Sequence, residues 1–149
     1  MNFLYAALRR VPILRRICPT AGRRERVRGR ATPNTVLYAF HCGPSTQNER
    51  FQRYKVGKTV DLARRIRPYR TIYPNGQVFY SVACADIDVA ERWLHDVLKM
   101  SGYHVAREIF EVPPDVMKAT MDAVVGLHRF WLVNGKRPGR IRTLAKATY

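Results

Sequence analysis

A strand–turn–helix pattern over residues 52–67 constrains the fold of this 149-residue chain more than any other feature. Residues 52–57 read QRYKVG, in which Gln, Tyr and Val alternate with Arg, Lys and Gly as the two faces of a β-strand require. The chain leaves this strand at Gly57. Thr59 or Asp61 can then accept hydrogen bonds from the free N–H groups of a first helical turn. The pattern predicts a strand followed at once by a helix.

The predicted helix spans roughly residues 60–67 and has one apolar side. Leu62 and Ile66 are four residues apart and would both face the core. Pro68 is expected to end the helix, because proline removes a backbone hydrogen bond. Arg65 follows Leu62 by three residues, so it would project from the margin of the buried side. That position suits a cationic group at the edge of a cleft.

Further strand and helix patterns lie on both sides of this unit. Residues 35–42 and 77–84 are rich in β-branched and aromatic residues and are bounded by turn residues. Residues 86–100 and 115–133 carry apolar residues at helical spacing. We therefore predict a small α/β (α+β) domain over residues 34–115. Its three-stranded, mainly antiparallel sheet would be flanked by helices.

Positive charge is concentrated at the two ends of the chain. The sequence has 27 Lys and Arg against 11 Asp and Glu, a net charge of +16. Residues 1–33 contain nine Arg and one Glu, and residues 116–149 contain seven basic residues and one Asp. Residues 34–115 are nearly balanced. We expect a basic arm, a central domain, and a final helix with a basic tail. Such ends attract polyanions, of which nucleic acid is the commonest.

The N-terminal arm, residues 1–33, has three interpretations. It is rich in Arg and poor in acidic residues, as an organelle transit peptide is. It would equally serve as a nucleic-acid-binding arm, or as an extension with little structure. Three cysteines without paired spacing indicate a reducing, intracellular compartment such as cytoplasm, nucleoid or nucleus. No apolar run is long enough to span a membrane. Nothing in the sequence indicates an oligomeric state.

Residues 54–59, YKVGKT, together with Arg65, resemble the second motif of the GIY-YIG nuclease superfamily. In order along the chain, residues 91–95 (ERWLH) and 108–112 (EIFEV) resemble later segments of one branch of it. That branch is encoded by phages and viruses, is described as DNA-binding, and is related to a meiotically up-regulated gene family. The resemblance covers residues 36–112, about half of the chain. It implies a partner that is DNA or, alternatively, RNA.

The resemblance also implies roles for individual residues. Tyr38 would be the general base or would orient the attacking water, and Arg65 would stabilise the phosphate in the transition state. Glu91 would hold one divalent ion, Mg²⁺ or Mn²⁺, which needs few protein ligands. His95 would assist proton transfer or orient Glu91. The residues expected to contact the phosphate backbone are Lys55, Lys58, Arg64 and Arg67.

Two departures from the family pattern keep a second function open. Val36 stands where the first motif has glycine, and Lys55 stands where the second motif has tyrosine. Lysine binds phosphate as a point charge but cannot accept a hydrogen bond as a phenol does. Structural roles are also open, since Glu91 could form a capping box with Asp88. The sequence thus predicts either a metal-dependent phosphodiesterase or a non-catalytic module that binds DNA or RNA.

Overall fold

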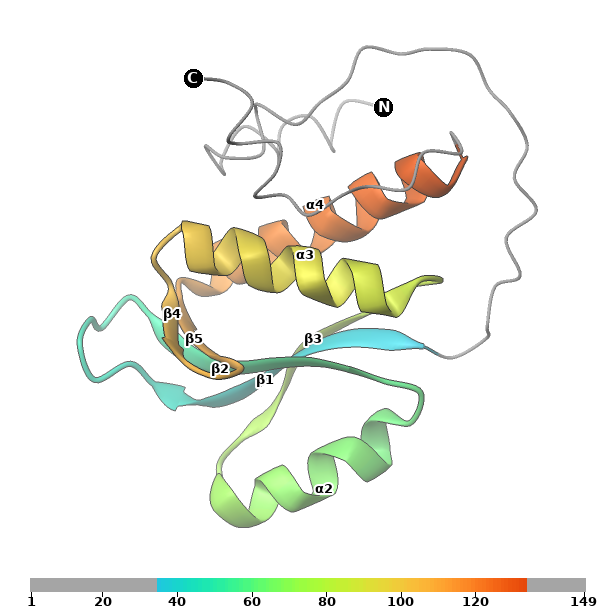
Figure 1. Ribbon diagram of the computed structural model, residues 1–149. Helices are drawn as coiled ribbons and strands as arrows, with labels where there is room; N and C mark the ends of the chain where they lie inside the picture. The colour runs from blue at the N-terminus through green and yellow to red at the C-terminus, as the bar shows by residue number, and fades with distance from the viewer. Residues whose placement is uncertain (1–34, 134–149) are drawn as a thin grey trace.

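Alternate side chains of the first strand, β1 (Val36–Pro44), point to opposite faces of the sheet, and helices cover both faces (Figure 1). Leu37 and Ala39 join the larger apolar cluster on one face, whereas Tyr38 and Phe40 join a smaller cluster on the other. The computed structural model describes residues 35–133. Two helices, α3 and α4, cover the first face, and one helix, α2, covers the second.

The sheet has five strands in the order β3-β1-β2-β5-β4, and every neighbouring pair is antiparallel. In chain order, the elements after β1 are β2 (Gln52–Thr59), α2 (Leu62–Ile72), β3 (Gln77–Ala83), α3 (Ile87–Met100), β4 (His104–Ala106), β5 (Ile109–Val112) and α4 (Pro114–Val133). The predicted class, an antiparallel sheet flanked by helices, is confirmed.

The prediction of three strands is wrong, because two short strands extend the sheet beyond β2. Residues 109–112 form β5, which pairs with the first half of β2 so that Gln52 lies opposite Val112 and Lys55 opposite Ile109. β4 then folds back onto β5. Phe110 is fully buried in the larger cluster. The chain after α3 therefore completes the sheet.

The helix α2 begins as predicted but does not end at Pro68. The Asp61 carboxylate accepts a hydrogen bond from the backbone N–H of Arg64 at 3.0 Å and caps the helix. The helix then continues through Pro68 to Ile72. Ile66 and Tyr69 on either side of the proline are both buried against the sheet. Their packing outweighs the one hydrogen bond that the proline removes.

The predicted capping box at the start of α3 is also wrong. The N-cap residue is Asp86, and its side chain makes no capping hydrogen bond. Asp88 and Glu91 instead contact the Lys58 ammonium from β2. The apolar stripe of α3 is confirmed, since Trp93 and Val97 lie in the larger cluster. One side of α3 therefore packs, and another carries carboxylates.

The ends of the chain lie outside the described residues. The predicted basic arm, residues 1–33, and the tail after residue 133 belong to them. The division into an arm, a central domain at 34–115 and a C-terminal part at 116–149 remains a prediction. Within residues 35–133, none of the helices combines the length and apolar character needed to cross a bilayer.

Candidate nucleic-acid interface and active site

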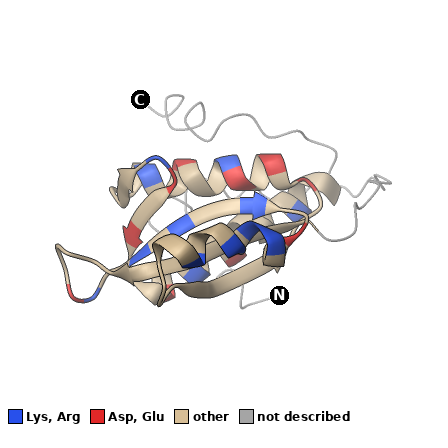
Figure 2. Cartoon of the chain, turned by 90° about the horizontal axis from the view of Figure 1, so that it is seen from below, with Lys and Arg blue, Asp and Glu red and all other residues tan. Residues whose placement is uncertain are grey.

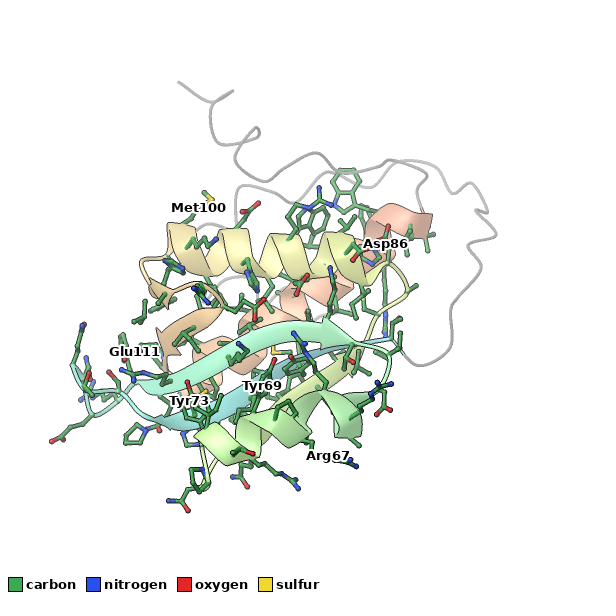
Figure 3. All side chains as sticks on the ribbon, turned by 60° about the horizontal axis from the view of Figure 1, so that its bottom comes forward. Arg67, Tyr69, Tyr73, Asp86, Met100 and Glu111 are labelled. Carbon is green, nitrogen blue, oxygen red and sulfur yellow. The ribbon has the colours of Figure 1, made fainter. Side chains whose placement is uncertain are left out.

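Two tyrosines and an arginine meet between α2 and the sheet. The hydroxyl groups of Tyr38 on β1 and Tyr69 on α2 lie 3.1 Å apart, within hydrogen-bond distance. Nε of Arg65 donates a second hydrogen bond to the Tyr38 hydroxyl at 3.2 Å. Figure 3 shows Tyr69 between α2 and the strands. The structure thus brings together Tyr38 and Arg65, which the sequence predicted, with Tyr69, which it did not.

Gly57 makes room for this cluster. The β1–β2 register places Tyr38 directly opposite Gly57. A Cβ atom on Gly57 would lie 2.8 Å from the Tyr38 hydroxyl oxygen and 3.1 Å from the adjacent ring carbon. Real Cβ atoms essentially never approach a neighbour this closely. The glycine of the motif is therefore required by the phenol on the neighbouring strand.

The Tyr38 hydroxyl keeps its proton at neutral pH. Its side chain has no solvent exposure. Burial raises the pKa of Tyr38 well above its ordinary range, and the hydrogen bond with Tyr69 raises it further. Arg65 opposes this shift only in part. Tyr38 can therefore position a neighbouring group by hydrogen bonding. In this buried environment the loss of its hydroxyl proton is unfavourable.

Tyr69 is the residue that sequence reasoning missed. The Lys55 ammonium lies 4.9 Å from the centroid of its ring, and the Arg65 guanidinium carbon lies 5.7 Å away. These cation–π contacts hold both cations beside the buried phenols. A signal was present, because Tyr69 follows Arg65 by four residues on one helix and so shares its face.

A second polar cluster lies at the end of β2 on the α3 side. The Lys58 ammonium lies 2.5 Å from Oδ1 of Asp88 and 2.7 Å from Oε2 of Glu91. These two carboxylates raise the pKa of Lys58, and Lys58 lowers the pKa of Asp88. Lys58 therefore stays charged at neutral pH. Two residues predicted for different roles, Lys58 and Glu91, are direct partners.

The two clusters lie around one edge of β2. Lys55 and Lys58 project to opposite faces of the sheet. β1 pairs with the last residues of β2 on one edge, but β5 begins opposite Lys55, so in the described chain no strand pairs with those residues on the other edge. Glu108 lies just before β5 and forms an ion pair with Lys55 at 3.3 Å. The backbone carbonyl of Glu108 also accepts a hydrogen bond from the Val56 N–H at 3.0 Å. The two clusters therefore lie on opposite faces of the same strand.

His95 is half-buried, its Nε2 atom is shielded from solvent, and its ring is neutral at pH 7. It follows Glu91 by four residues on α3, and its ring lies 5.2 Å from that of Phe110. Burial lowers the pKa of His95, while the Glu91 charge opposes this shift. Among residues 35–133, no group forms a hydrogen bond with its Nε2 atom. His95 thus presents a neutral nitrogen beside the second cluster, without a direct bond to Glu91.

The comparison with protein families gives one match. A model of the T5orf172 domain family matches residues 35–125, more than half of the chain. The chain belongs to this family. The T5orf172 domain is phage-associated and is related to nuclease-type folds. No curated protein and no solved structure matches the chain. Membership supports contact with nucleic acid and agrees with the fold.

The sequence assigns a divalent ion to Glu91 of this T5orf172 domain. Within the described part of the chain, no three His, Cys, Asp or Glu side chains gather as a metal cluster. Mg²⁺ needs only one or two carboxylates, because it keeps several water ligands. The contact between Glu91 and the Lys58 ammonium indicates that a cation is stable beside this carboxylate. Glu91, with Asp88 one turn earlier, would hold the ion.

The outer surface of α2 is strongly basic. It carries exposed arginines at positions 64, 67 and 70, three residues apart, and the helix contains no acidic residue. In Figure 2, which views the chain from the α2 side, Lys and Arg colour parts of the front helix and of the neighbouring strands blue. Figure 3 shows Arg67 directed away from the sheet. The sequence predicted Arg64 and Arg67 as phosphate contacts, and Arg70 extends the same row.

Proposed function

We propose that this T5orf172 domain is a GIY-YIG-type nuclease domain that binds DNA and hydrolyses its phosphodiester bonds. The observation that carries the proposal is the contact of Arg65 with Tyr38, which in turn lies beside Tyr69, on the α2 side of the sheet. On the α3 side of the same strand β2, Lys58 pairs with Glu91. Cutting a phosphodiester needs a cation for the phosphoryl oxygens and a group that positions water. Both kinds of group meet here.

The basic row on α2 would position the DNA. The side chains of Arg64, Arg67 and Arg70 are exposed to solvent. They can therefore contact successive phosphates without disturbing the packing of α2 on the sheet. Phosphate contacts fix orientation and carry no sequence information. Lys55, held beside Tyr69, would then contact the phosphate nearest the edge of β2. Binding through this surface would depend strongly on salt concentration.

The chemistry would take place at the margin of α2. Arg65 is exposed while its Nε atom is fixed on Tyr38, so its remaining N–H groups can stabilise charge on a phosphoryl oxygen. The Tyr38 hydroxyl, protonated and held by two partners, would orient the attacking water. His95 would assist proton transfer as a neutral imidazole. Glu91 would hold a divalent ion, which would supply positive charge for the phosphoryl and leaving oxygens.

The second candidate is a binding module without catalytic activity. Two observations favour it, namely the complete burial of Tyr38 and the ion pair of Glu91 with Lys58. Both groups are engaged with protein partners in this conformation. The arginine row does not depend on either group. Binding would therefore persist if cleavage were absent.

A plasmid-relaxation assay with Mg²⁺, run beside a gel-shift assay, distinguishes the two functions. We expect wild type to nick supercoiled DNA. Arg65→Ala and Glu91→Gln should bind DNA with little change but cut at least about 100-fold more slowly, because each removes transition-state stabilisation. If no protein cuts while all shift DNA, the domain is a binding module.

A charge-matched control separates local from general effects. Arg129 is exposed on α4, on the other side of the sheet from α2. Arg129→Ala should bind and cut like wild type, whereas Arg67→Ala should weaken binding of every DNA sequence and reduce its salt dependence. Equal losses in the two variants would contradict binding through α2. Competition with single-stranded RNA tests the preference for DNA.

A further inference from the structure

Lys58 neutralises Glu91 from the end of β2. Its ammonium contacts Asp88 at 2.5 Å and Glu91 at 2.7 Å. Side-chain exposure is 70% at Asp88, 37% at Lys58 and 19% at Glu91, so the contact with Glu91 is the more shielded of the two. Water screens a shielded ion pair less than an exposed one. Glu91 is therefore already paired with a cation.

A divalent ion would compete with this ammonium for the same carboxylate. Mg²⁺ binds a carboxylate oxygen at about 2.0–2.1 Å, so it would bring two positive charges into the space around Glu91. Oε2 of Glu91 already accepts from Lys58. Repulsion between the two cations would weaken the binding of metal for as long as Lys58 stays in place.

A nucleic-acid phosphate offers Lys58 another partner. The Lys58 side chain is partly exposed, and a flexible stem of methylene groups carries its ammonium. Lys55, three residues earlier on β2, and Arg65 lie on the α2 face of the sheet and would draw a nucleic-acid phosphate toward the exposed end of this strand. In the part of the chain that the structure describes, no strand pairs with the β5 edge of β2 beyond Lys55. The ammonium can therefore turn from the carboxylates to a phosphate without unfolding β2.

We propose that Lys58 is a cation latch: it occupies the carboxylates of Asp88 and Glu91 until a phosphate of bound nucleic acid draws it away and admits the divalent ion. This inference rests on the proposed function. Nucleic acid and metal then bind cooperatively. The coupling is reciprocal, so each ligand tightens binding of the other by the same factor. The domain would hold its metal only when a substrate is present.

The test measures Mn²⁺ binding to the full chain from the electron paramagnetic resonance signal of the free ion. Without DNA, Lys58→Met should bind Mn²⁺ about tenfold more tightly than wild type, a factor within the usual range of coupling between two sites. A saturating short duplex with phosphorothioate linkages, which resist hydrolysis, should tighten Mn²⁺ binding to wild type by a similar factor. The duplex should leave the affinity of Lys58→Met unchanged.

Three further proteins serve as controls. Glu91→Gln with the duplex reports the Mn²⁺ that the DNA itself binds. Lys118→Met removes a lysine that also pairs with a carboxylate, Asp122, but on α4, and it should behave like wild type. Lys58→Gln repeats the test with a polar side chain should Lys58→Met fail to fold, as judged by circular dichroism.

Two results would overturn the latch. One is equal Mn²⁺ affinity of wild type and the Lys58 variants without DNA. The other is an effect of the duplex that persists when Lys58 is replaced. Failure of the proposed function is a separate result, in which wild type does not bind the duplex. The Mn²⁺ affinities measured without DNA then still decide whether Lys58 competes with the metal at Glu91. Tighter Mn²⁺ binding by the Lys58 variants supports this competition, and equal affinity refutes it.

Discussion

The two faces of the sheet are stabilised in different ways. Among residues 35–133, eighteen buried residues form the cluster under α3 and α4, and nearly all of them are aliphatic, aromatic or Met. The cluster under α2 has four buried residues, of which Tyr38 and Tyr69 carry hydroxyl groups. The contrast indicates that packing under α3 and α4 supplies most of the folding stability. The other face can therefore hold polar and cationic groups next to solvent.

The largest expected effect comes from removing an aromatic side chain under α3. Trp93→Ala should destabilise the protein by about 3–5 kcal/mol, because it leaves a large cavity in the main cluster. Ile66→Ala, under α2, should lower the free energy of unfolding by about 2 kcal/mol, the low end for such a truncation. Urea unfolding measures both. A loss for Ile66→Ala as large as that for Trp93→Ala would refute the contrast.

A change at Gly57 should act on the α2 face alone. Gly57→Ala brings a methyl group against the Tyr38 hydroxyl, and such overpacking destabilises by about 1–3 kcal/mol. The double variant Gly57→Ala/Tyr38→Phe removes the hydroxyl that clashes most closely. Its loss of stability should be smaller than the sum of the two single losses. Additive losses in urea unfolding would show that the methyl group and the hydroxyl do not meet.

Glu111 should stabilise the same face in a pH-dependent way. Its carboxylate accepts hydrogen bonds from Ser45 and Arg53, and these partners lower its pKa in that order. Because folding lowers the pKa of Glu111, its ionised form stabilises the folded state at pH values above the ordinary pKa of glutamate. This stabilisation is lost as the pH falls through the lowered pKa.

Glu111→Gln should therefore destabilise the protein by about 1.5 kcal/mol at pH 7, a typical value for a hydrogen bond to a charged group. Thermal unfolding at several pH values should show this gap shrinking below about pH 4.5, near the ordinary glutamate range. A gap that is constant down to pH 2 would exclude the ion pair as its cause.

The smallest effect should come from the surface of the α4 layer. Lys118 pairs with Asp122 four residues later at 2.7 Å, and both side chains are more than a third exposed. Lys118→Met should change the free energy of unfolding by no more than about 0.5 kcal/mol. High salt should remove most of that difference. A larger loss would mean that polar contacts also stabilise this layer.

Local patterns predicted most of the fold. The alternation in residues 52–57, the cap at Asp61 and the apolar stripe of α3 involve neighbours within one turn or one strand. The errors concern competition between local and distant contacts. Pro68 does not end α2, because Ile66 and Tyr69 pack against the sheet. β4 and β5 were missed because their pairing depends on partners far away in the sequence.

The candidate site was predicted residue by residue, but its pairings were not. The sequence singled out Tyr38 and Arg65, and the structure places them in contact. It gave no sign that Lys58 and Glu91, 33 residues apart, would form an ion pair. That contact depends on how α3 lies across β2, which spacing along the chain does not encode. The roles of these residues in catalysis remain predictions.

The small cluster under α2 has a consequence for heat resistance. Few buried side chains attach this helix, so we expect its backbone amides to exchange with deuterium sooner than those of α3. A brief local opening would separate Arg65 from Tyr38 while the α3 and α4 layer stays folded. Warming should therefore abolish function several degrees before circular dichroism records global melting, and cooling should restore it.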